Sequence, residues 1–91
     1  MPNPVTEVGT PTVLTGTATV RTGAAEMLGF ICASTTGGTV VIHDATGATN
    51  AVSGTFTPTA GQWYPFPASM RTGIHIVIAN TISITVFHNP L

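Results

Sequence analysis

The chain has 91 residues, a formal net charge of −1 and charged side chains at only 5% of its positions. Soluble domains usually carry about 25% charged residues. With two arginines and no lysine, the chain cannot form a basic patch, so we expect neither nucleic acid nor an anionic membrane as a partner. Low charge and 43% hydrophobic content favour one small domain that works in an assembly, over a free domain kept soluble by its many threonines.

The sequence predicts no disulfide within the chain, no signal peptide and no membrane helix. Cys32 is the only cysteine, so no disulfide can form within the chain, and its apolar surroundings predict a buried structural thiol. The first residues contain neither the basic region nor the apolar region of a signal peptide. The longest apolar stretch, residues 74–79, is far shorter than the roughly 20 residues of a membrane helix. We therefore expect synthesis in the cytoplasm without an encoded export signal.

Residues 1–12 are predicted to form an extended N-terminal arm. Pro2, Pro4 and Pro11 lack the backbone N–H that a central strand needs, so the segment is a sheet edge or a free tail. A disordered terminus is the alternative, and under both interpretations the arm adds little to the core. Residues 13–91 are predicted to form one β domain, because strand-favouring threonine, valine and isoleucine dominate between short glycine and proline interruptions.

The strands are placed by alternating side chains and by turn residues. In chain order, we expect an alternating strand at 13–22, a hairpin at 27–44 with its turn at 35–38, a strand at 51–57, a proline-bearing extended segment at 62–67, and a hairpin joining 73–79 to 83–88. The count of six or seven strands predicts an all-β fold. It would be a compact antiparallel β-sandwich of jelly-roll or Greek-key type, with a small barrel as the main competitor.

The last hairpin is predicted to supply the centre of the core. A three-residue loop at 80–82 would place Ile76 opposite Val86 and Ile78 opposite Ile84. A slip of one residue in this register would reverse every face.

Eight residues are predicted to form contacts with other subunits. Trp63 and Tyr64 can stack a sugar or a proline-rich peptide, but the few amides and acids near them favour a lid on the core or an interface anchor. Arg21 and Arg71 lie in two matching four-residue segments, 20–23 and 70–73, which suit two equivalent corners of the fold. The predicted interface residues are Pro2, Pro4, Val5, Pro11, Arg21, Trp63, Tyr64 and Arg71.

No set of residues meets the requirements of catalysis, so we predict no enzyme, no cofactor and no metal. His43 adjoins Asp44 in a strand and points to the opposite face, which rules out a triad. His75 and His88 would face each other after a one-residue slip and could then hold a metal or an anion together with other subunits. One chain shows no zinc-ligand spacing, however, which favours histidines that are simply hydrogen-bonded.

Five segments in a fixed order resemble small β-sandwich proteins of tailed bacteriophages. They are an apolar strand marked by Gly29 (28–32), a Gly-Thr-Val strand that ends in Asp44 (38–44), an Ala-Gly turn before an aromatic-Pro-x-Pro corner (57–67), and a final apolar pair (73–78 and 83–86). The order of the segments carries the resemblance, because each segment alone has low specificity. The arm before Pro11 lies outside it.

This resemblance implies a capsid decoration (cement) protein on the surface of the virion. Such proteins commonly sit as trimers over gaps between hexamers of the major capsid protein, with an arm that reaches a neighbour. The implied partners are the major capsid protein and further copies of this chain, held by many weak contacts, with residues 1–12 contributing. The alternative is a tail, neck or host-attachment module that binds a glycan through Trp63 and Tyr64.

Overall fold

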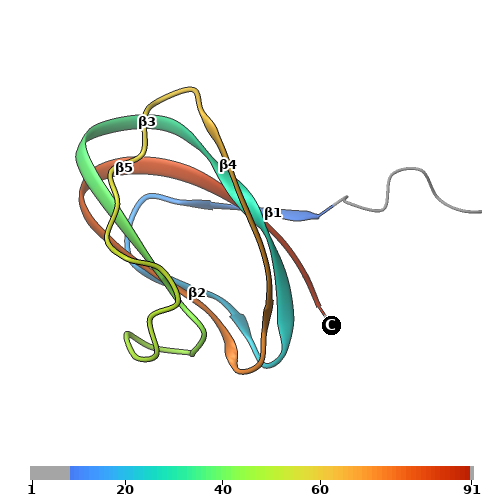
Figure 1. The fold of residues 1–91 in the computed structure, drawn as a ribbon. Helices are drawn as coiled ribbons and strands as arrows, with labels where there is room; N and C mark the ends of the chain where they lie inside the picture. The colour runs from blue at the N-terminus through green and yellow to red at the C-terminus, as the bar shows by residue number, and fades with distance from the viewer. Residues whose placement is uncertain (1–8, 91) are drawn as a thin grey trace, which may run out of the picture.

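The computed structural model describes residues 9–90, which form one antiparallel sheet (Figure 1). Its strands are β1 (Thr10–Leu14), β2 (Ala18–Thr22), β3 (Ala25–His43), β4 (Trp63–Met70) and β5 (Gly73–Pro90). They are ordered β1-β5-β3-β4, and β2 also pairs with β5. The all-β antiparallel prediction is confirmed, but residues 9–90 contain five strands instead of six or seven. No helix in this range is long and apolar enough to cross a membrane.

The two long strands, β3 and β5, pair along almost their whole length. Both predicted hairpins, 27–44 and 73–88, are therefore wrong, because each segment continues as one strand through its supposed turn. Gly37 (φ 65°) and Asn80 (φ 63°) take left-handed backbone conformations there, and the Asn80 side-chain amide donates to the Gly37 carbonyl at 2.9 Å. The turn residues thus bend two paired strands at the same level and leave the ladder continuous on both sides.

Gly38 is required beside this bend because β3 and β5 approach each other closely. A Cβ at Gly38 would lie 2.6 Å from the Ile82 Cβ and 3.0 Å from the Thr81 carbonyl oxygen. The Gly38 N–H donates to Thr35 Oγ1 at 3.0 Å, which satisfies this donor where the register of the ladder shifts. The sequence Thr-Thr-Gly-Gly therefore encodes a bend instead of a chain reversal.

The bend changes which residues face one another. Ile76 pairs with Ile42 and Val86 pairs with Phe30, so these two β5 residues do not pair with each other as predicted. The second predicted pair is wrong for the same reason. Three of the four residues are nevertheless completely buried, and the fourth packs against them. Burial could be predicted from alternation, whereas the partner of each residue depended on the bend.

The short strands line one edge of β5. The predicted strand 13–22 is two strands, because β1 pairs with the second half of β5 and β2 pairs with its first half. β1 begins at Thr10, so the predicted boundary between arm and domain after residue 12 lies inside a strand. Pro11 is tolerated there because β1 is an edge strand. Residues 1–8 of the predicted arm, including Pro2, Pro4 and Val5, lie outside the described residues.

The predicted strand 51–57 does not form. The segment belongs to the long loop between β3 and β4 and makes only two isolated bridges, Phe56 with Val40 and Ala51 with His43. Phe56 and Val40 exchange both backbone hydrogen bonds, at 2.9 and 3.1 Å. The loop therefore runs beside the second half of β3 and protects the edge that β4 does not reach.

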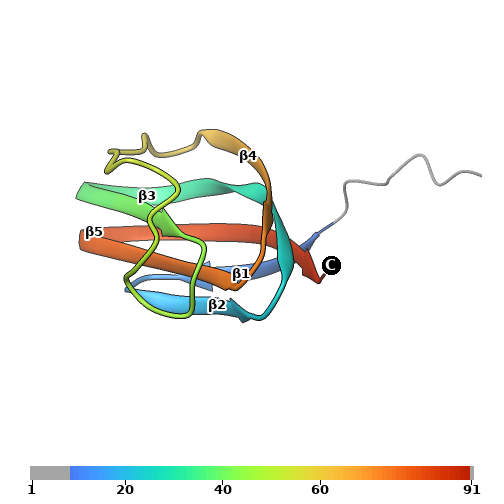
Figure 2. The ribbon, with the colours of Figure 1, turned by 60° about the horizontal axis from the view of Figure 1, so that its bottom comes forward.

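The core lies between the two halves of the curved sheet (Figure 2). Because β3 and β5 both bend, residues from before the bend, such as Phe30, pack in one cluster with residues from after it, such as Val40. The Phe30 ring lies 5.3 Å from that of Tyr64 and 5.6 Å from that of Phe56, measured between ring centroids. Cys32 is buried, as predicted, and burial raises the pKa of its thiol.

Candidate functional site

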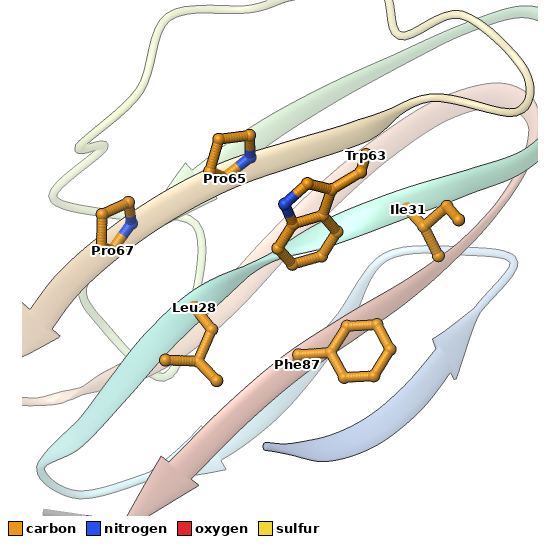
Figure 3. Close-up of a pocket in the computed structure, with 6 residues that line it drawn as sticks. All are labelled: Leu28, Ile31, Trp63, Pro65, Pro67 and Phe87. Atoms are coloured by element: carbon orange, nitrogen blue, oxygen red, sulfur yellow. The ribbon is translucent and has the colours of Figure 1, made fainter. Parts of the chain in front are cut away.

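An apolar groove of about 590 Å³ lies on the outer face of the sheet, away from the core (Figure 3). It crosses β4, β3 and β5, and its lining residues are Leu28, Ile31, Trp63, Pro65, Pro67 and Phe87. Successive side chains of a strand point to opposite faces, so Phe30, Tyr64 and Val86 enter the core while residues next to them face outward. Among residues 9–90, no charged side chain and no side chain of a polar residue lines the groove.

Trp63 and Phe87 form the aromatic part of the groove. Their ring centroids are 5.7 Å apart and their planes are inclined at 73°, an edge-to-face contact. The indole lies across Gly29 of β3, where a Cβ would come within 2.8 Å of Trp63 Cη2 and would meet the Tyr64 carbonyl oxygen. The absence of a side chain at Gly29 therefore lets the indole approach the surface of the sheet and leaves the groove open.

Exposed apolar side chains continue beyond the groove to β1, in a row across four strands whose member on β5 is Thr85. Val13 is 66% exposed, Trp63 is 47% exposed and Ile31 is 38% exposed. Thr85 pairs with both Val13 and Ile31, and Ile31 pairs with Trp63, which aligns the three. We call Val13 and the six groove residues the outer apolar face. The solvent-facing side of an antiparallel sheet is usually polar, and contiguous apolar patches mark interaction sites.

The structure separates Trp63 from Tyr64. The Tyr64 ring lies 5.2 Å from the Phe56 ring, on the core side of β4, and its hydroxyl accepts a hydrogen bond from the Thr59 N–H at 2.6 Å. The two residues point to opposite faces, as neighbours in a strand do. One sugar ring cannot stack on both. Tyr64 serves as a lid on the core, and Trp63 is available as an anchor.

The two arginines of the predicted interface lie off the outer apolar face. Their matching segments, 20–23 and 70–73, form neighbouring corners, where the Gly23 N–H donates to the Thr72 carbonyl at 2.8 Å. The side chains differ, however. Arg21 is partly buried and its Nε–H donates to His88 Nδ1 at 2.9 Å, whereas Arg71 is exposed. Arg21 therefore has a structural partner within the domain.

His88 is held in its neutral form by its neighbours. Because the Arg21 Nε–H can only donate, His88 Nδ1 must accept, and its Nε2–H donates to Thr12 Oγ1 at 2.8 Å. Burial, and secondarily the charge of Arg21, lower the pKa of His88. His75 lies opposite His43, with ring centroids 5.9 Å apart, so the proposed juxtaposition of His75 with His88 does not occur.

His75 belongs to a short chain of hydrogen bonds. The Thr19 hydroxyl donates to the Thr46 carbonyl at 2.9 Å and accepts from the His75 Nδ1–H at 2.8 Å. His43 Nδ1 is buried and has no hydrogen-bond partner among residues 9–90. A protein zinc site needs three or four ligands, and no cluster of three or more His, Cys, Asp or Glu residues in the described part of the chain could hold a metal ion.

Asp44 fastens the turn between β4 and β5 to the end of β3. Its Oδ1 accepts hydrogen bonds from the backbone N–H of Thr72 at 2.8 Å and of Gly73 at 3.4 Å, and its Oδ2 accepts from that of Arg71 at 3.1 Å. These hydrogen bonds, chiefly the one from Thr72, lower the pKa of the Asp44 carboxyl. The Asp44 carboxylate therefore has a structural role, because it satisfies the backbone N–H groups of this turn.

We expect Asp44→Asn to lower the free energy of unfolding by about 1 kcal/mol at pH 7, because the amide keeps only one acceptor oxygen and no charge. The folded-state pKa of Asp44 is lowered from its unfolded value of about 3.9, so its contribution is present above that value and is lost as the pH falls through the folded pKa. In urea unfolding, the variant should therefore have a lower free energy of unfolding than the wild type at pH 7, and the two free energies should become equal in acid. Glu26→Gln controls for net charge, and an equal difference at both pH values would contradict the assignment.

Sequence reasoning identified Trp63 and its flanking prolines but missed Leu28, Ile31 and Phe87. These three residues lie in apolar runs that predicted buried strands. Nothing in their own composition distinguishes the outward-facing members from the inward-facing ones.

Comparison with protein-family models, curated proteins and solved structures gave no match for this chain. Its function is therefore argued from the geometry and chemistry of the outer apolar face.

Proposed function

We propose that this chain is a non-enzymatic virion structural protein, a capsid decoration (cement) protein that binds the major capsid protein shell of a bacteriophage. The observation that carries the proposal is the outer apolar face, where Trp63, Ile31 and Val13 are exposed on the same face of one sheet. Apolar patches of this kind mark protein–protein contacts, and tryptophan is prominent among the residues that dominate binding energy.

The charge distribution supports a protein partner. Only 5% of residues are charged, and none of those in the described part of the chain lines the groove. Contact with a shell would therefore depend on burial of apolar and hydroxyl-bearing surface, repeated over several subunits, so that weak single contacts add up. In this proposal the curved five-stranded sheet acts as a reduced β-sandwich of the phage type, and a homotrimer would present three such faces.

The test is binding to purified shells that lack decoration protein, measured by co-sedimentation. Trp63→Ala should weaken binding by at least about 30-fold, which corresponds to the 2 kcal/mol of a central interface residue. Val13→Asp should also weaken binding, because a charge would be buried in the contact. Val52→Asp is the matched control, since Val52 is 42% exposed but lies in the β3–β4 loop.

Thermal unfolding of each variant would show that the domain still folds. The proposal fails if Val13→Asp and Val52→Asp bind shells equally well. It also fails if the wild type ignores shells and Trp63 instead binds a glycan, which would favour a host-attachment module.

A further inference from the structure

The groove is uncovered over residues 9–90, and the chain enters the domain at its wall. A Cβ at Gly9 would lie 2.8 Å from Leu28 Cδ1 and 3.2 Å from the Phe87 Cβ, and both of these side chains line the groove. β1 begins at the next residue. Residues 1–8 are therefore attached at the edge of the groove.

We propose that residues 1–8 of the same chain bind back into the groove and cover Trp63. Their composition fits it, because Pro2, Pro4 and Val5 are apolar and the prolines favour an extended polyproline conformation. Grooves lined by aromatic residues bind segments of this kind. The described lining offers Trp63 and Phe87 for contact with the prolines and carries no charge, so the Glu7 carboxylate of the segment would have to remain in water.

The length of the segment also fits. Eight residues in a polyproline conformation span about 25 Å, at roughly 3.1 Å per residue. The groove crosses three neighbouring strands, which is about 10 Å of sheet. The segment can therefore reverse its direction near Gly9, where the absent Cβ permits many backbone conformations, and still cross the groove.

The groove could be filled by residues 1–8 of the same chain or by those of a second copy, and attachment beside the groove favours the same chain. A segment tethered at the groove has an effective concentration in the millimolar range, because its attachment confines it to the site. Residues 1–8 of a second copy would compete for the groove only if the protein itself reached a millimolar concentration. Covering the groove also removes Trp63 and Phe87 from water in a chain with few charges, and residues 1–8 would have to leave the groove before Trp63 could contact a shell.

Trp63 is the only tryptophan, so its fluorescence reports on the groove directly. Deletion of residues 1–8 should shift its emission to longer wavelength. Acrylamide quenching should rise roughly twofold, because the segment would cover a large part of the Trp63 ring, which is 47% exposed in the structure. Adding a synthetic peptide of residues 1–8 to the shortened protein should reverse both changes in a saturable manner.

Two full-length variants test the chemistry. The first variant carries Pro2→Ser, Pro4→Ser, Val5→Ser and Val8→Ser, which keeps the length but removes every apolar side chain after Met1, and it should behave like the deletion. The second variant carries Asn3→Ser and Thr6→Ser, which alters only polar residues of the segment, and it should behave like the wild type. Circular dichroism would show that both variants keep the sheet.

Two results would overturn the proposal. One is identical emission and quenching of Trp63 in the full-length and shortened proteins. The other is a difference that appears only at high protein concentration together with a larger mass in analytical ultracentrifugation, because the groove would then hold the segment of a second copy.

Discussion

Replacing Phe30 with alanine is expected to lower the free energy of unfolding by about 3–5 kcal/mol, the usual cost of removing a buried phenylalanine. Phe30 is 1% exposed, pairs with both Tyr64 and Val86, and contacts the Phe56 ring of the β3–β4 loop. Its ring thus joins the sheet to the loop that covers it. Domains are stable by only about 5–15 kcal/mol, so urea unfolding should show a large fraction of that stability lost.

Phe87→Ala is the matched control for this prediction. Phe87 lies on the neighbouring strand but faces outward into the groove, where it is only partly buried. Its removal should cost about 1 kcal/mol, as for a typical substitution outside the core. Equal losses in the two variants would contradict the assignment of Phe30 to the core and Phe87 to the outer apolar face.

Gly29→Ala should cost about 1–3 kcal/mol and displace Trp63. The new Cβ would meet the Tyr64 carbonyl oxygen and lie 2.8 Å from Trp63 Cη2. A backbone oxygen cannot rotate away as the end of a side chain can, so β4 would have to shift from β3. Urea unfolding measures the loss of stability, and a change in Trp63 emission in the folded state reports the displacement.

Gly54→Ala provides the comparison, because no heavy atom lies within 4 Å of a Cβ at Gly54. It should leave both stability and Trp63 emission nearly unchanged. A Gly29→Ala protein as stable as this control, with unaltered emission, would show that β3 and β4 are not packed as closely as the structure has them.

The strand content of the fold could be predicted because the strand preference of threonine, valine and isoleucine is local. The bend could not. Glycine at 37 and asparagine at 80 permit left-handed backbone conformations, and such residues usually reverse the chain. Here the Asn80 side chain bonds the Gly37 carbonyl across two strands, so the outcome depended on residues 43 positions apart in the chain.

The outward-facing residues of the candidate site could not be predicted from the sequence because of a local irregularity in β3. The ladder register shifts between Met27 and Gly29, on both sides of β3. This bulge places Leu28 and Ile31 on the same face although they are three residues apart, which a period of two cannot indicate. Trp63 was visible in the sequence, because an aromatic residue beside prolines in a chain with few charges already suggested an anchor.

The pairing of the two long strands has a consequence for synthesis of the protein. β3 ends at His43, but β5, its partner over both halves, spans Gly73–Pro90, and the pair at the end of β5 joins Ala25 to Pro90. At roughly 5–20 residues per second, the ribosome needs several seconds to supply β5 after β3 has been made. During that interval the edge of β3 that pairs with β5 is unpaired, so the nascent chain is open to aggregation until β5 has been added.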